Sequence, residues 1–326
     1  MSVNVTFCGA VRTVTGSMHL LEADGERVVI DAGLFHGRRD DFYKVNSYFH
    51  FNPAQVDAAV ISHSHIDHCG NLPNLVRNGF KAKVFVTRAT KDLCNLMLLD
   101  SAKIQEEDIK FVNKINARKG LPLRRPLYTI EEAKKSLKKI RAVDYYKKFK
   151  LTDSISCTFY NSGHILGSAI PMLEIKNRAR YLSKAIKIAY AVDLGRNDIP
   201  LLRGPDILSD PDYLIIESTY GGRAHEPVVQ AKAKLAEAIE RTVSRKGKVI
   251  IPSFALERTQ EVVYYLMRLI RVKKIRPVPI YVDSPLACDI TDVFIRNSES
   301  FNLEAKALIR RKADIFGIGS INYIRS

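Results

Sequence analysis

The chain has 326 residues, of which 46% are hydrophobic, and its 51 Lys and Arg against 35 Asp and Glu give a formal net charge of +16. This length and composition predict one large or two ordinary domains with buried cores, and they exclude a disordered chain. No stretch approaches 18 uninterrupted apolar residues, which excludes a membrane span. The excess of basic residues has two interpretations: the protein binds a polyanionic partner, or it is simply a basic soluble protein.

The first sixty residues have the pattern of short strands, which we expect at 4–7, 17–22, 26–30 and 56–61. Helical periodicity then predicts helices over about 91–119 and 131–139. Between residues 101 and 150 there are fifteen Lys or Arg against six Asp or Glu. A charge run of this kind is typical of a solvated helix face, but its density makes this region the expected phosphate-facing surface.

Strands are expected again at 156–161, 169–175, 187–192 and 213–216. After residue 217 the pattern alternates between helix and strand. The expected helices are 226–245, 257–272 and 286–296, and the expected strands are 248–252 and 278–282. This alternation predicts a second domain with a parallel sheet, and we place the domains at 1–219 and 220–326.

The five cysteines are odd in number, scattered, and lack a Cys-x-x-Cys pair. This usage predicts free thiols in a reducing compartment. The first residues lack the basic and apolar regions of a secretory signal. We therefore expect a cytoplasmic, soluble protein with no membrane association.

Residues 63–68 read His-x-His-x-Asp-His and place four metal-binding side chains within six positions. An apolar run of strand length precedes them and helix-opening residues follow, so they are expected on a turn at a strand end. Imidazole and carboxylate donors without sulfur are the ligand set of a catalytic Zn²⁺ or a similar divalent ion. This spacing predicts a metal site.

Other polar residues also fall at the carboxyl ends of expected strands: Asp31, His164, Asp193 and Glu217. If those strands shared one face of a sandwich, their end residues would converge. Taken alone, His164, Asp193 and Asp31 are more typical of hydrogen-bonded turn residues, and Glu217 could be a helix cap. His19, His36 and His50 have no such spacing, and we assign them to packing or to the surface.

Two metal ions can clamp the attacking and leaving oxygens of an in-line displacement at phosphorus. Residues two apart in an extended turn point the same way, so His63 and His65 can hold one ion while Asp67 and His68 turn towards another. His164 could complete the first group. Asp193 could bridge both ions, and Asp31 could orient a ligand.

The 63–68 motif, together with the later strand ends, resembles the metallo-β-lactamase superfamily, an αββα sandwich. Three later stretches, at 217–225, 251–261 and 281–286, resemble the β-CASP nucleases of that superfamily. The fold class implied is α/β, an αββα metallo-β-lactamase sandwich with a Rossmann-like parallel α/β β-CASP domain that is incomplete.

The resemblance implies two zinc ions, with Mn²⁺ as the alternative. One would be held by His63, His65 and His164, and the other by Asp67, His68 and Asp193. It implies hydrolysis of single-stranded RNA by a hydroxide that bridges the ions, with Asp67, Asp31 and Glu217 as catalytic residues. The residues implied in substrate binding are Ser253, Arg258, Ser284 and His225.

One departure from the family pattern concerns histidine. The family has two further histidines after the βα region, whereas no histidine follows His225 here. We therefore expect a chain truncated at its C-terminus, with a complete first metal site and a weak second one. The alternatives are a catalytically weakened or inactive RNA-binding protein, and another hydrolase of this fold acting on thioesters or lactams. The sequence does not decide between endonuclease and 5′-exonuclease action. It also does not decide the oligomeric state, for which a homodimer is one alternative.

Overall fold

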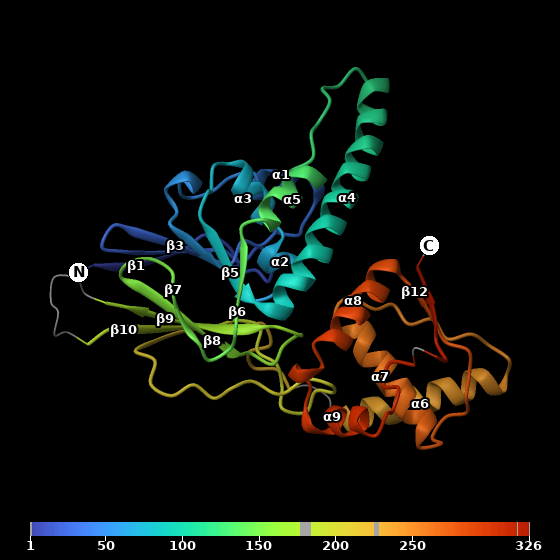
Figure 1. Cartoon of the computed structure of the whole chain (residues 1–326). Helices are drawn as coiled ribbons and strands as arrows, with labels where there is room; N and C mark the ends of the chain where they lie inside the picture. The colour runs from blue at the N-terminus through green and yellow to red at the C-terminus, as the bar shows by residue number, and fades with distance from the viewer. Residues whose placement is uncertain (1, 177–183, 225–227, 318, 326) are drawn as a thin grey trace. The chain divides into compact units, whose positions relative to one another are not determined.

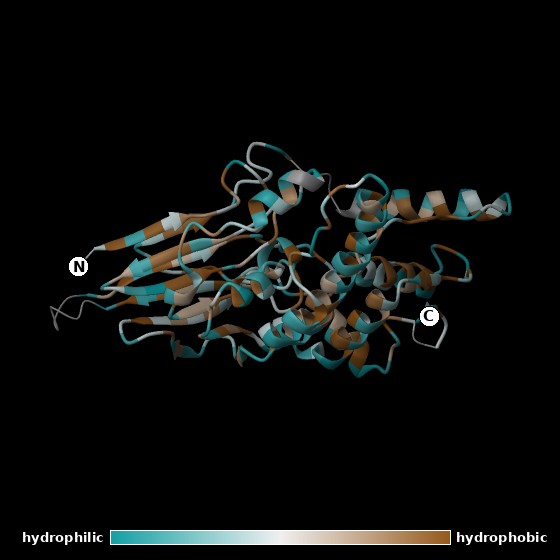
Figure 2. Ribbon diagram, turned by 90° about the horizontal axis from the view of Figure 1, so that it is seen from above, coloured by the Kyte–Doolittle hydropathy of each residue, from teal (hydrophilic) through white to brown (hydrophobic). Residues whose placement is uncertain are grey.

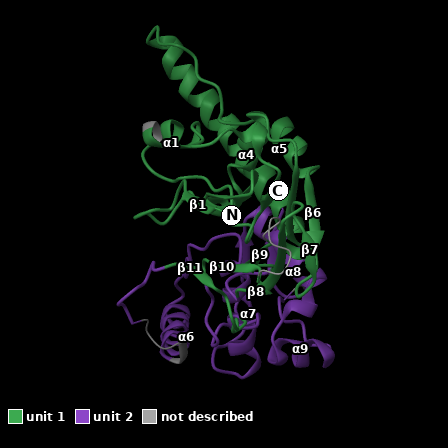
Figure 3. Cartoon of the chain, turned by 90° about the vertical axis from the view of Figure 1, so that its left-hand side faces the viewer, with its two compact units in different colours: residues 1–162, 167–193, 206–217 green, residues 163–166, 194–205, 218–326 purple. Residues whose placement is uncertain are grey.

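The computed structural model describes residues 2–176, 184–224, 228–317 and 319–325. The chain divides into two compact units (Figure 3). The first comprises 1–162, 167–193 and 206–217, and the second comprises 163–166, 194–205 and 218–326. The domain limits expected from the sequence, 1–219 and 220–326, stay a prediction.

The first unit contains a six-stranded sheet in the order β1-β2-β3-β4-β5-β6. Strands β1 to β3 pair antiparallel, and β3 to β6 pair parallel. The strands are β1 (Val3–Phe7), β2 (His19–Ala23), β3 (Glu26–Ile30), β4 (Ala58–Val60), β5 (Lys83–Thr87) and β6 (Ile140–Val143). Because β3 to β6 run parallel, their carboxyl ends meet at one edge of the sheet.

A second sheet of five strands has the order β11-β10-β9-β8-β7. Its pairs are antiparallel except for β10 and β11, which run parallel. The strands are β7 (Lys148–Lys150), β8 (Ile155–Asn161), β9 (Ala169–Ile175), β10 (Ile186–Ala191) and β11 (Tyr213–Ile216). The loops after β8 and β10 carry His164 and Asp193, so this sheet supplies the second set of expected ligands.

The first unit is layered, because alternate residues of the first sheet face different cores. Val28 and Ile30 pack with Phe159 of the second sheet, whereas Val29 packs with Leu72 and Leu98 of the helices. Figure 2 shows hydrophobic residues in brown and hydrophilic residues in teal along the strands. The helices are α1 (Arg39–Asn46), α2 (Ile66–Cys69), α3 (Leu72–Arg77), α4 (Arg88–Arg118) and α5 (Ile130–Leu137), and a 3-10 turn lies at Pro53–Gln55.

Helix α4 is the long helix that runs upward in Figure 1. The sequence predicted a start near residue 91, but the helix begins at Arg88 because the Thr87 side chain accepts a hydrogen bond from the Thr90 N–H. Thr87 Oγ1 also donates to the Gly167 carbonyl at 2.6 Å. The helix start is therefore fixed to the loop between β8 and β9.

The second unit contains α6 (Val228–Ser244), α7 (Arg258–Arg271), β12 (Tyr281–Asp283), α8 (Pro285–Arg296), a 3-10 turn (Ser298–Ser300), α9 (Leu303–Arg310) and β13 (Asn322–Ile324). Ile239 of α6 and Leu266 of α7 share a core with Ile275. Strands β12 and β13 pair parallel. Parallel pairing of the kind that the sequence predicted is therefore present.

The strand expected at 248–252 does not form, and this part of the prediction is wrong. A strand requires a neighbouring backbone to complete its hydrogen bonds. Residues 248–251 instead line a cavity of about 740 Å³ together with 278–284. Ile250 is 87% exposed. The strand expected at 278–282 is shorter and shifted, because β12 runs from Tyr281 to Asp283.

Among the residues that the structure describes, no helix is long and apolar enough to cross a membrane. All five cysteines, Cys8, Cys69, Cys94, Cys157 and Cys288, are free thiols.

The loop after β3 packs against α2 backbone to backbone at Gly33. The Gly33 N–H donates to the Ser17 carbonyl at 2.8 Å, and the neighbouring Ala32 N–H donates to the His68 carbonyl at 2.8 Å. A Cβ atom on Gly33 would lie 1.6 Å from the Asp67 carbonyl oxygen. Only glycine allows this approach between the Asp31 loop and the Asp67 turn.

We expect Gly33→Ala to lower the free energy of unfolding by more than about 3 kcal/mol, because two backbone segments must separate. Chemical denaturation monitored by circular dichroism measures this. Gly319→Ala is the matched control, since its Cβ would meet no atom within 4 Å. Equal stability of the two variants would contradict the packing described for Gly33.

Candidate metal centre

The expected ligands follow strand ends, on loops or on the short helix α2. His63 follows β4, and His65 is the residue that precedes α2, the helix that carries Asp67 and His68. Asp31 follows β3 with φ 58°, and Asp193 follows β10 with φ 46°. Left-handed conformations of this kind are costly outside glycine and cluster at functional sites.

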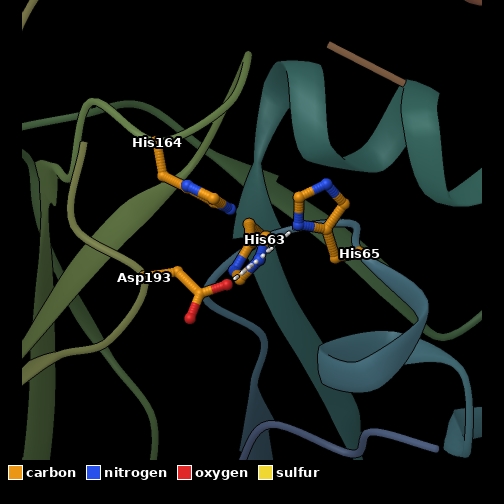
Figure 4. Close-up of side chains that lie close together, drawn as sticks. All are labelled: His63, His65, His164 and Asp193. Atoms are coloured by element: carbon orange, nitrogen blue, oxygen red, sulfur yellow. Dashed lines mark hydrogen bonds and ion pairs between the residues drawn. The ribbon is translucent and has the colours of Figure 1, made fainter. Parts of the chain in front are cut away.

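Four of the predicted residues come together: His63, His65, His164 and Asp193. One ligand atom from each lies within 4.8 Å of all the others (Figure 4). His63 Nε2 is 3.2 Å from His65 Nδ1 and 3.3 Å from Asp193 Oδ2. Three imidazoles and a carboxylate thus converge on one point.

These separations suit a small divalent ion. Bonds of about 2.0–2.1 Å in a tetrahedron place neighbouring donor atoms about 3.3–3.4 Å apart. The observed separations of 3.2 and 3.3 Å around His63 Nε2 match that spacing. The donor set, with no thiolate, is typical of a catalytic divalent-metal site and not of a closed structural zinc site.

A second group shares an atom with the first. His68 Nε2 lies 3.4 Å from Asp193 Oδ2, the same oxygen that approaches His63, and 3.9 Å from Asp67 Oδ2. Asp193 Oδ2 therefore belongs to both groups. The described residues bring three donors to this second group, one fewer than to the first.

Asp31 is fully buried and holds the histidine turn in place. Its Oδ2 lies 2.7 Å from His68 Nδ1, and its Oδ1 accepts the Ser62 N–H at 2.7 Å. The Ser62 hydroxyl donates to Asp31 Oδ2 at 2.9 Å and lies 3.0 Å from His63 Nδ1. The ring nitrogens that face away from the ligand groups are thus anchored, which fixes the direction of the other nitrogens.

Burial and neighbouring charges set the protonation of this cluster. Burial, together with the nearby His68, holds the pKa of His63 well below its usual range, so this imidazole is neutral and can bind a metal. Burial would lower the pKa of His68 too, but the carboxylates of Asp31 and Asp193 raise it to about 10. His68 therefore carries a proton that a bound cation would replace.

Two residues of this network were not foreseen from the sequence, Tyr190 and Ser17. The Tyr190 hydroxyl lies 3.2 Å from Asp31 Oδ2 and 2.7 Å from Ser17 Oγ. His19 packs against the Tyr190 ring, and burial lowers its pKa to about 4. His19 is thus a packing residue as expected, and His36 and His50 are exposed.

The remaining predicted residues lie outside the four-residue group. Glu217 is half-buried at the end of β11, and its N–H donates to the Ala191 carbonyl at 3.3 Å. Ser284 accepts the Ala287 N–H and caps α8. Ser253 and Ser284 both line the 740 Å³ cavity, and exposed Arg258 pairs with Glu261 at 2.6 Å. His225 lies outside the described residues.

Glu257 holds the loop that carries His164. Its Oε2 accepts the Leu166 N–H at 3.0 Å, while its buried Oε1 has no hydrogen-bond partner. The backbone of Glu257, at φ 67° and ψ −59°, lies outside the regions that side chains favour. Burial, and then the nearby Glu261 carboxylate, raise the pKa of Glu257 well above its ordinary value of 4.5.

Comparison with known proteins identifies the class. The profile of the metallo-beta-lactamase superfamily matches residues 11–134, and that of the Beta-Casp domain matches residues 259–326. The chain belongs to the metallo-beta-lactamase superfamily and carries a Beta-Casp domain. The α/β fold class expected from the sequence is confirmed.

Three curated relatives illustrate the family. "Ribonuclease TTHA0252" of Thermus thermophilus is 33% identical over 92% of this chain and 62% of its own length. "Endoribonuclease YSH1" of Eremothecium gossypii is 34% identical over 79% of this chain and 32% of its own. "Transcription termination factor FttA" of Pyrococcus horikoshii is 33% identical over 86% and 42%. The chain thus spans less than two thirds of each of these relatives.

We expect the stability of the protein to depend on pH through Glu257. The folded state keeps the Glu257 proton to a higher pH than the unfolded chain, so the free energy of unfolding falls as pH rises above 4.5. Glu257→Gln removes this titration and should flatten the decline. Thermal unfolding of both proteins across pH, at one metal concentration, measures the difference, and exposed Glu299→Gln is the control. Parallel curves for wild type and Glu257→Gln would contradict the assignment.

Proposed function

We propose that this protein is a metal-dependent ribonuclease that hydrolyses phosphodiester bonds in single-stranded RNA with two divalent ions, zinc or alternatively manganese. The observation that carries the proposal is the Asp193 carboxylate, whose Oδ2 is shared between the His63 and His68 groups. Relatives named as ribonucleases support RNA as the substrate. We infer a role in RNA processing or decay at a cytoplasmic location; a homodimer stays a prediction.

His63, His65, His164 and Asp193 would hold the first ion, and Asp67, His68 and Asp193 the second. When bound, such ions polarise phosphoryl oxygens and make water a nucleophile near neutral pH. The chain's contribution is to keep His63 neutral, to fix both histidine rings through Ser62 and Asp31, and to leave Asp193 partly exposed at 27%. Substrate can therefore reach the open side of a buried ligand cluster.

We propose that Glu217 delivers a proton to the leaving oxygen. Asp193 and Glu217 follow the ends of β10 and β11, which are paired strands with Ala191 opposite Ile216. Both carboxylates therefore emerge at the same sheet edge. An acidic group beside the ligand cluster can deliver a proton to the departing oxygen.

RNA binding without cleavage is the second candidate. The observation in its favour is the smaller second group, to which the described residues supply three donors. Weak occupancy of that site would slow hydrolysis while leaving basic surfaces free to bind RNA.

We expect the protein to cleave single-stranded RNA in the presence of Zn²⁺ or Mn²⁺, and His65→Ala to reduce the rate at least about 100-fold, because the first group loses a donor. Gel analysis of end-labelled RNA measures this and also separates internal from terminal cleavage. His50→Ala, which removes an exposed histidine, is the matched control. Salt-dependent RNA binding with no cleavage at any metal concentration would favour the second candidate.

We expect Asp31→Asn to weaken metal binding about 10- to 100-fold, because the buried amide no longer fixes His68 as the carboxylate does. Titration calorimetry with Mn²⁺ or Zn²⁺ gives affinity and stoichiometry. Tyr190→Phe removes a hydroxyl from the same carboxylate without changing its charge, and we expect a smaller effect. Unchanged metal affinity in Asp31→Asn would remove Asp31 from the proposed centre.

A further inference from the structure

Two sets of basic residues in and near region 101–150 differ in their surroundings. Some are paired with carboxylates: Lys134 with Glu131, Lys147 with Asp144, and Lys150 with Asp153, each at 2.7 Å. Others line an open cavity of about 630 Å³, which we call the basic cavity. Its lining comprises Val76, Gly79, Phe80, Lys81, Ala82, Lys83, Lys135, Lys138, Lys139 and Arg141. Six of these ten residues are cationic, and none is acidic.

No carboxylate neutralises the six cations by an ion pair in the described part of the chain. Lys139 Nζ donates to the Lys81 carbonyl at 2.9 Å. One terminal nitrogen of Arg141 donates to the carbonyls of Lys138 and Ile140, at 2.9 and 3.1 Å. These bonds hold two cations against neutral oxygens and leave their charge uncompensated. The C-terminal end of α5 favours a cation such as Lys135 in its last turn or Lys138 at its cap, but it does not explain the other four cations.

The basic cavity lies at the edge of the first sheet opposite the candidate metal centre. Lys83 begins β5 and pairs with Ala58 at the start of β4, and Arg141 stands near the start of β6. The ligand His63 follows the other end of β4. The length of β5, about 13 Å at about 3.3 Å per residue, therefore separates the two edges.

We propose that the basic cavity is a second RNA-binding surface, which holds phosphates of the RNA backbone away from the metal centre. The proposal extends the proposed function, since it takes RNA as the ligand. Bound phosphates would release counterions, and the affinity gained would fall with salt.

The chemistry of the lining favours a polyanion over a small phosphate ligand. Small anions are typically held by converging backbone N–H groups or by an arginine fork, and one of the two terminal nitrogens of Arg141, the single arginine of the lining, already donates to backbone carbonyls. The exposed lysines Lys81, Lys83, Lys135 and Lys138 act instead as point charges spread around the start of β5 and the end of α5. The aromatic residue in the lining, Phe80, is 1% exposed and offers no stacking face. Binding of RNA to the basic cavity should therefore be independent of base sequence.

The test compares two double variants of equal charge. Lys135→Gln with Lys138→Gln removes two cavity cations, whereas Lys147→Gln with Lys150→Gln removes two exposed lysines that are already paired. Binding of single-stranded RNA is measured by fluorescence anisotropy with a chelator present, across salt, so that cleavage plays no part. Hydrolysis of bis(p-nitrophenyl) phosphate with metal present reports separately on the metal centre.

We expect the cavity variant to lose about tenfold or more in RNA affinity at low salt, and its slope of log affinity against log salt to fall by about 1 to 2. The paired-lysine control should change much less, and both should hydrolyse the small diester like the wild type. Equal losses in the two variants, or no RNA binding by the wild type, would overturn the proposal. The proposal would also be overturned if the cavity variant lost the binding of inorganic tripolyphosphate but kept the binding of RNA. A wild type that binds RNA through the cavity but hydrolyses nothing would refute the proposed function and leave this inference standing.

Discussion

The buried contact between Asp31 and His68 is the constraint on which the rest of the centre depends. Asp31 is fully buried, and a carboxylate in that position is tolerable only when its oxygens are satisfied. The Asp31 oxygens accept hydrogen bonds from the Ser62 N–H and hydroxyl and contact the His68 ring nitrogen. These contacts tie the loop after β3 to the residues that follow β4. The direction of the metal-facing nitrogens follows from this anchoring. A change at Asp31 therefore acts on the metal site without removing a donor.

The two edges of the parallel part of the first sheet differ in chemistry for a topological reason. Parallel strands place all their carboxyl ends together, so loops that bear histidine and aspartate collect at one edge and the strand starts collect at the other. Here the strand starts gather Lys83 and Arg141, near the lysines that follow α5. Phosphate binding at one edge and phosphate chemistry at the other would be compatible, because the cations of the basic cavity do not compete with divalent ions for the same carboxylates.

Much of the centre was predictable from the sequence, because the spacing of His63, His65, Asp67 and His68 is specific and the strand ends at Asp31 and Asp193 follow apolar runs. Tyr190 was not predictable, since its role depends on a strand of the second sheet lying over Asp31, a contact across 159 residues. The strand expected at 248–252 failed for the opposite reason. Its apolar pattern is real, but a strand depends on a backbone neighbour that the local sequence does not encode.

Backbone strain separates Glu257 from the two aspartates. Asp31 and Asp193 have φ of 58° and 46°, values that aspartate tolerates better than most residues. Glu257 combines φ 67° with ψ −59°, which only glycine adopts readily, and it also buries a carboxyl oxygen without a partner. The hydrogen bond that Glu257 accepts from the Leu166 N–H offsets part of these costs. A glycine at position 257 would avoid both costs, but it would also release Leu166. We therefore explain Glu257 by the position in which it holds the 163–166 loop, and not by a gain in stability.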